Sequence, residues 1–144
     1  MADIRRLSAQ QLQNYLLNAI RYMDERPEDS ARLIPEILGE MVARRERSSS
    51  AEHPLTSLGY NVRWRDWHAR ERQRLLGWLM DARLPRQVES VMGTAGSLQR
   101  KSYIRGTIER WSRIYGGQPN MEQARARWLA DLAFIDARAA EGDG

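Results

Sequence analysis

The stretch RWRDWHARERQRLLGWLM, residues 63–80, is the most distinctive part of the chain and the part that decides its fold. Large apolar residues recur in it at the three- and four-residue intervals of one helix face. We therefore expect one long helix from Asn61 to about Arg83. The residues on its apolar side are Trp64, Trp67, Leu75, Trp78 and Leu79. Because large aromatic side chains at helical spacing usually pack inward, we assign the tryptophans to the core.

Helical spacing of apolar residues continues on both sides of this stretch. Ser8 begins a capping-box pattern ahead of a first helix. A second helix is expected to start near Ser30, with Pro35 in or before its first turn, because proline deeper in a helix is costly. Ser97 and Asn120 are expected to cap two later helices.

The expected fold is all-α, a compact bundle of five to six helices with no β-sheet. No segment shows the alternating pattern of a strand, and a chain of 144 residues fits a single domain covering 1–144. Within it we expect a flexible loop at about 48–60 and a frayed C-terminal tail at about 139–144.

Composition excludes several classes of function. Cysteine is absent, so disulfides, thiolate metal sites and cysteine nucleophiles are ruled out. No apolar run approaches the length of a membrane span, and the N-terminus is charged from the start. We expect a soluble cytoplasmic protein that does not contact a membrane.

Positive charge is concentrated in the middle of the chain. Residues 1–60 carry 8 basic and 9 acidic side chains, residues 61–116 carry 12 and 5, and residues 117–144 carry 3 and 5. Only Lys101 is a lysine; the other basic residues are arginines, which codon bias in a GC-rich bacterial genome would also produce. The location of the charge favours a polyanion or an acidic protein as the partner.

Two groups of basic residues are the candidate binding surface. The first group lies on the outward side of the expected long helix and consists of Arg63, Arg70 and Arg74. The second follows Ser97 and consists of Arg100, Lys101, Arg105, Arg110 and Arg113. Guanidinium groups bind phosphate in a bidentate manner, so we expect a nucleic-acid-binding protein, DNA or RNA, or a subunit of a ribonucleoprotein complex. This interpretation requires the two groups to form one continuous face.

The main alternative is a protein–protein adaptor or inhibitor, of the kind that phages and mobile elements encode, whose basic face docks on an acidic partner. Such a contact needs an apolar anchor at its centre. Leu55, Leu58 and Tyr60 are the candidates, provided that they are exposed.

A helix-turn-helix DNA-binding regulator is a weaker alternative for residues 85–105. A short helix, a turn at Gly93 and a basic helix have the right outline. However, Glu89 stands where a small residue should pack, and Gln99 and Ser102 stand where the recognition helix should be anchored. The register of the motif therefore does not fit.

No catalytic constellation is evident. Glu71 lies on the apolar side of its helix with Asp66 and His68 nearby, but such a carboxylate more often pairs with an arginine from a neighbouring helix. His53 is far away in the chain, and the glycines form no phosphate-binding pattern. We expect no enzyme activity, no cofactor and no metal.

Overall fold

The computed structural model describes residues 3–48, 53–63 and 67–142, with side chains through residue 138. The described residues form helices and no strands, so the all-α prediction is confirmed. They form seven α-helices, where five to six were expected. A short 3-10 helix, η1, precedes them at Ile4–Arg6. The α-helices are α1 Ala9–Arg21, α2 Pro27–Ser48, α3 Pro54–Ser57, α4 Ala69–Asp81, α5 Arg86–Met92, α6 Leu98–Tyr115 and α7 Glu122–Gly142.

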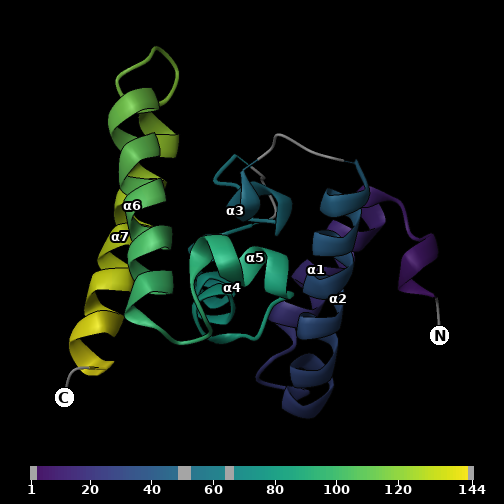
Figure 1. Ribbon diagram of the computed structural model, residues 1–144. Helices are drawn as coiled ribbons and strands as arrows, with labels where there is room; N and C mark the ends of the chain where they lie inside the picture. The colour runs from purple at the N-terminus through teal and green to yellow at the C-terminus, as the bar shows by residue number, and fades with distance from the viewer. Residues whose placement is uncertain (1–2, 49–52, 64–66, 143–144) are drawn as a thin grey trace.

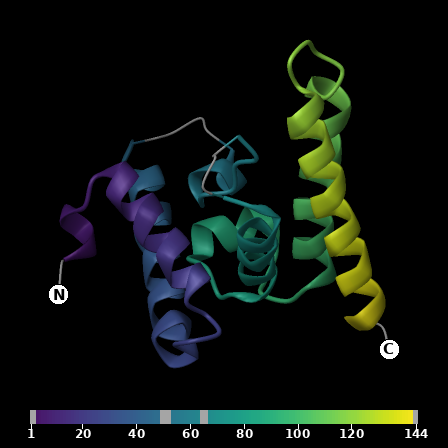
Figure 2. The same ribbon diagram turned by 180° about the vertical axis from the view of Figure 1, so that it is seen from behind.

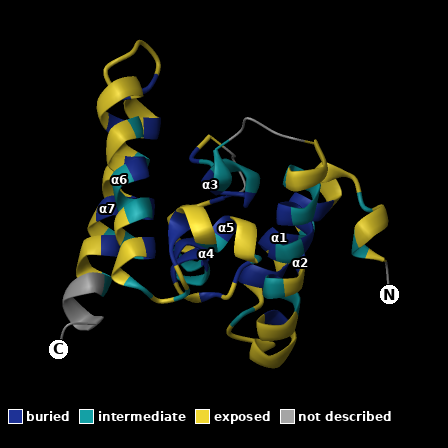
Figure 3. Cartoon of the chain, in the orientation of Figure 1, coloured by how far each residue is buried: buried dark blue, intermediate teal, exposed yellow. Residues whose placement is uncertain are grey.

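Two helical hairpins lie on either side of α4 (Figures 1 and 2). The first pairs α1 with α2 and the second pairs α6 with α7. α4 contacts α1 on one side and α7 on the other, with α3 and α5 close to it. Buried residues follow the sides of the helices that face one another, and exposed residues cover the outer sides (Figure 3). None of the helices described is long and apolar enough to cross a membrane.

Local signals set several helix ends. The Ser8 side chain accepts from the Gln11 backbone N–H and the Gln11 side chain accepts from the Ser8 N–H, which completes the predicted capping box. Ser97 caps α6 as predicted. Gly93 ends α5 with φ 102°, where a Cβ would lie 2.8 Å from the backbone nitrogen of Arg100. Only glycine fits that turn without strain.

The long helix expected from Asn61 to Arg83 is wrong at its start, because α4 begins at Ala69. Side chains here form hydrogen bonds with backbone groups that a longer helix would use for its own hydrogen bonds. The Asn61 side chain accepts from the backbone N–H of Arg63, which favours a turn there. The Trp67 carbonyl accepts from the buried guanidinium of Arg72. Trp67 is buried, as predicted, whereas Trp64 and Asp66 lie outside the described residues.

The second helix also differs from the prediction. α2 begins at Pro27, before the expected start at Ser30, so Pro35 lies inside it. Pro27 suits a first helical position because its φ is preset and its missing N–H has no helical partner there. Ser30 is buried in this first turn, and its hydroxyl donates to the Ala19 carbonyl 2.7 Å away. Burial of Ile34 and its neighbours along the helix offsets the hydrogen bond that Pro35 cannot make.

Two connections were also predicted only in part. The loop expected at about 48–60 contains α3, which Pro54 opens and His53 caps. Asn120 does not begin the last helix; it lies in the preceding turn with φ 66°, a conformation that asparagine tolerates. α7 extends to Gly142, and residues 143–144 lie outside the described residues.

Candidate functional site

The first predicted basic group is divided between two places. Arg70 and Arg74 both donate to Oδ2 of Asp24, in the turn after α1, at 2.5 and 2.6 Å. The hydrogen bond from Arg74 is the largest of the contacts that hold the pKa of Asp24 below its ordinary value. Arg63 lies elsewhere, exposed beside the start of α7, with Nη2 2.9 Å from the sulfur of Met121.

The second group is also divided. Lys101 and Arg110 are nine residues apart in α6, which at about 3.6 residues per turn places them on opposite sides of the helix. Arg105 turns toward α7, where it pairs with Asp136, and it also pairs with Glu109 on α6. Arg110 and Arg113 remain exposed. The two basic groups therefore do not form one continuous face.

Arg100 is the clearest correction among the predicted binding residues, because its side chain is 0% exposed. Its guanidinium donates to the carbonyl oxygens of Gly93, Leu79 and Ala82 and to the Glu89 carboxylate. These bonds join the ends of α4 and α5 to the first turn of α6. Arg100 therefore stabilises the fold and is not on a binding surface, and the Glu89 that does not fit a helix-turn-helix is its ion-pair partner.

The apolar contact proposed for an adaptor is also wrong. Leu55, Leu58 and Tyr60 are all 2% exposed or less, so they are not available at the surface. Glu71 pairs with Arg21 of α1 at 3.4 Å, as the sequence suggested for a buried carboxylate. Among the residues described, no three histidine or acidic side chains gather in a way that could hold a metal ion.

An open pocket of about 520 Å³ brings together aromatic, amide and cationic side chains from the cap of α3, the segment after α3, α6, the turn between α6 and α7, and α7. We call it the aromatic–basic pocket. Its rings are those of His53, Tyr60, Trp111, Tyr115 and Trp128. The Asn61 and Gln118 amides and the Arg63 guanidinium also line it, and no acidic residue is among the described residues that do so.

The rings form a connected cluster around Trp111. The Tyr60 ring lies 6.3 Å from it at an interplanar angle of 17°, and the Trp128 ring lies 6.4 Å from it. The His53 ring meets Trp111 edge-on at 5.2 Å. Tyr60 and Trp128 are buried, Trp111 is partly exposed, and Tyr115 is 42% exposed. Trp111 and Tyr115 are therefore the rings that an incoming ligand can reach.

His53 holds one edge of the pocket as a neutral ring. Its Nδ1 accepts from the backbone N–H of Leu55 at 3.1 Å, and its Nε2 lies 3.2 Å from the Tyr103 hydroxyl. Protonation of Nδ1 would break the cap of α3. Burial, and then the nearby charges of Arg110 and Arg45, lower the pKa of His53 below its ordinary value of 6.5. Two arginines therefore act on this edge of the pocket.

Tyr60 is fixed from behind by buried charges. Its hydroxyl donates to Oδ2 of Asp131 at 2.7 Å, and Asp131 pairs with Arg72. Burial, followed by the charge of Asp131, raises the pKa of Tyr60 well above its ordinary value of 10.0. The wall of the pocket that Tyr60 forms is thus rigidly attached to α4 and α7.

Sequence reasoning missed Trp111, Trp128 and His53 as site residues. His53 falls within the loop expected at about 48–60, where no site was proposed. The dipeptide His53–Pro54 carried a usable signal, because proline at a first helical position marks the preceding residue as a cap. Comparison of the chain with models of protein families, curated proteins and solved structures finds no significant match.

Proposed function

We propose that the protein binds single-stranded nucleic acid, with an unpaired base in the aromatic–basic pocket and the adjoining phosphates on Arg63 and Arg110. The proposal rests on one observation: accessible aromatic rings, amides and a guanidinium line the same pocket. No acidic residue is among the described residues that line it. The proposal does not depend on the continuous arginine face expected from the sequence, because the two basic groups lie apart in the fold.

Each part of the pocket matches one part of a nucleotide. Aromatic rings stack on unpaired bases, and Trp111 and Tyr115 are exposed enough to do so. Asn61 and Gln118 offer both donors and acceptors to a base edge. Arg63 lines the pocket and the charge of Arg110 acts on His53 at its edge, so these two arginines are our candidates for contacts to phosphates of the same strand. A volume of about 520 Å³ is within the range of roughly 300–1,000 Å³ typical of small-ligand pockets.

Fluorescence anisotropy with a labelled single-stranded oligonucleotide tests the proposal. We expect binding at low salt that weakens steeply as salt is raised, because each phosphate contact releases counterions. Arg110→Glu and Arg63→Glu should each weaken binding at least about tenfold. Arg6→Glu is the matched control, since Arg6 is an exposed arginine of η1 at the far side of the molecule from α6 (Figure 1). The proposal is wrong if the wild-type protein does not bind at low salt, or if the control weakens binding equally.

A further inference from the structure

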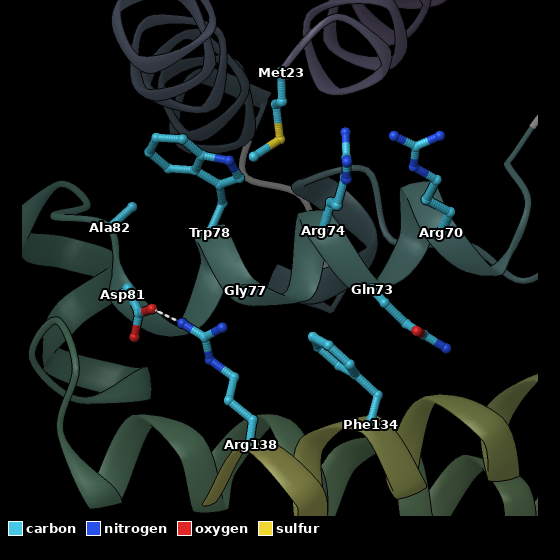
Figure 4. Close-up of a pocket in the computed structure, with 10 residues that line it drawn as sticks. All are labelled: Met23, Arg70, Gln73, Arg74, Gly77, Trp78, Asp81, Ala82, Phe134 and Arg138. Carbon is cyan, nitrogen blue, oxygen red and sulfur yellow. Dashed lines mark hydrogen bonds and ion pairs between the residues drawn. The ribbon is translucent and has the colours of Figure 1, made fainter. Parts of the chain in front are cut away.

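A second and larger pocket, of about 780 Å³, lies between the end of α1, α4 and α7. We call it the α4 pocket. Figure 4 shows α4 crossing it, with the end of α1 along one side and α7 along the other. It is separate from the aromatic–basic pocket and shares none of its lining residues. The apolar residues that line it are Met23, Gly77, Trp78, Ala82 and Phe134.

The centre of this pocket is kept open by Gly77. In Figure 4 Trp78 extends toward α1 and Met23, Phe134 reaches up from α7, and Gly77 lies between them without a side chain. A Cβ at Gly77 would lie 3.6 Å from Nη1 of Arg138, which is ordinary contact, so the position tolerates a side chain. Trp78 and Phe134 are both partly exposed. Both rings are therefore accessible to an apolar body that lies over Gly77.

One end of the α4 pocket carries excess positive charge. Arg70 and Arg74 extend to the same side of α4 and both donate to the single oxygen Oδ2 of Asp24. Arg74 is held in place by a second bond to the Ile20 carbonyl, and its side chain is only 21% exposed. The Asp24 side chain is 65% exposed. Arg74, which is positioned by this second bond, and the exposed Arg70 thus share one carboxylate that faces solvent.

The opposite end is electrically balanced. Arg138 of α7 pairs with Asp81 at the end of α4, and the dashed line in Figure 4 marks this ion pair. An anionic group entering the pocket would therefore be drawn to Arg70 and Arg74. A molecule with one anionic and one apolar end would therefore bind in one orientation, with its anionic end at Arg70 and Arg74.

We propose that the α4 pocket binds a small apolar molecule carrying one carboxylate, and that Asp24 occupies the position of that carboxylate in the free protein. The ligand's carboxylate displaces Asp24 from Arg70 and Arg74, and its apolar body packs between Trp78 and Phe134 over Gly77. Exposed ion pairs contribute little to stability, so displacement of Asp24 costs little. Charge-assisted bonds from the same two guanidiniums to the ligand replace those to Asp24, and burial of the apolar body against Trp78 and Phe134 adds to them.

Isothermal titration calorimetry with naphthalene-2-acetate as the probe tests this site. The acid should bind, and its uncharged amide should bind at least about tenfold more weakly, since it cannot replace a carboxylate on two guanidiniums. Asp24→Asn removes the competing charge and should tighten binding of the acid several-fold. Asp29→Asn is the matched control, because it removes an exposed acid of α2 that pairs with Arg32 outside this pocket, and it should leave the affinity unchanged.

The apolar part of the site is tested by Gly77→Leu, which fills the space between the two rings and should abolish binding. Thermal unfolding of this variant checks that it is folded. The proposal is overturned if the acid does not bind, if acid and amide bind equally, if Asp24→Asn binds no more tightly than Asp29→Asn, or if folded Gly77→Leu binds like the wild type. The acid–amide comparison uses only wild-type protein and stands even if a variant fails to fold.

Discussion

Arg72 and Asp131 form a buried ion pair that joins α4 to α7, with Nε of Arg72 2.9 Å from Oδ2 of Asp131. A second bond, from Nη2 to Oδ1, measures 3.2 Å, so the pair is bidentate. The two side chains are 3% and 0% exposed. Because the same carboxylate also holds the Tyr60 hydroxyl, this pair links the packing of two helices to the wall of the aromatic–basic pocket.

Asp131→Asn should lower the free energy of unfolding by about 3–5 kcal/mol, because it leaves the buried charge of Arg72 without a counter-ion. Urea denaturation measures the change. Asp136→Asn is the matched control: Asp136 pairs with Arg105 on the surface, and its loss should cost less than about 1 kcal/mol. If the two variants lost the same free energy of unfolding, burial would not explain the contribution of the Arg72–Asp131 pair to stability.

Arg100→Lys should destabilise the fold by at least about 2 kcal/mol, since an ammonium group cannot reach the three carbonyls and the carboxylate that the guanidinium bonds. The same change at exposed Arg113 of α6 should stay within about 0.5 kcal/mol of wild type. Chemical denaturation of both variants gives the comparison. A wild-type midpoint for Arg100→Lys would contradict the structural role of this residue.

The free energy of unfolding should fall as the pH drops below about 6.5. His53 then takes up a proton in the unfolded chain, whereas its lowered pKa keeps it unprotonated in the folded chain. The loss continues until the pH passes the folded pKa, and it is absent above the ordinary value. His53→Asn keeps a side chain that can cap α3 but does not titrate. Urea midpoints at a series of pH values should therefore fall less steeply for this variant than for wild type. Parallel curves would rule out His53 as a source of the dependence.

The all-α class and several helix ends could be predicted from the sequence because they depend on local signals, as at Ser8 and Ser97. The start of α4 could not, because the Trp67 carbonyl is bonded by Arg72, and no periodicity in apolar residues reveals that bond. Local spacing treats residues 61–68 as a continuation of the helix, whereas the side chain of Asn61 favours a turn at residues 61–63.

The errors at arginines have a different cause. Arg100 stands four residues before buried Ile104 and so lies on the inner side of α6, a register that could have indicated its burial. Arg72 stands in the same relation to buried Leu76. Charge alone suggested a surface position for Arg100, but acceptors supplied by other helices make the interior favourable for its guanidinium and for that of Arg72. The aromatic–basic pocket could not be predicted at all, since its residues come from segments far apart in the chain.

We propose that bases, and not phosphates alone, are bound, and one comparison of affinities tests this. The affinity of the protein for a single-stranded oligonucleotide is compared with that for a strand of the same length and charge that lacks bases. Stacking on Trp111 and Tyr115 predicts that the base-less strand binds at least about tenfold more weakly, since each stacked base contributes roughly 1–3 kcal/mol. Tyr115→Ala should reduce this difference, and Tyr22→Ala, at an exposed tyrosine at the end of α1, should not. Equal affinities of the wild-type protein for the two strands would show that the pocket does not bind bases.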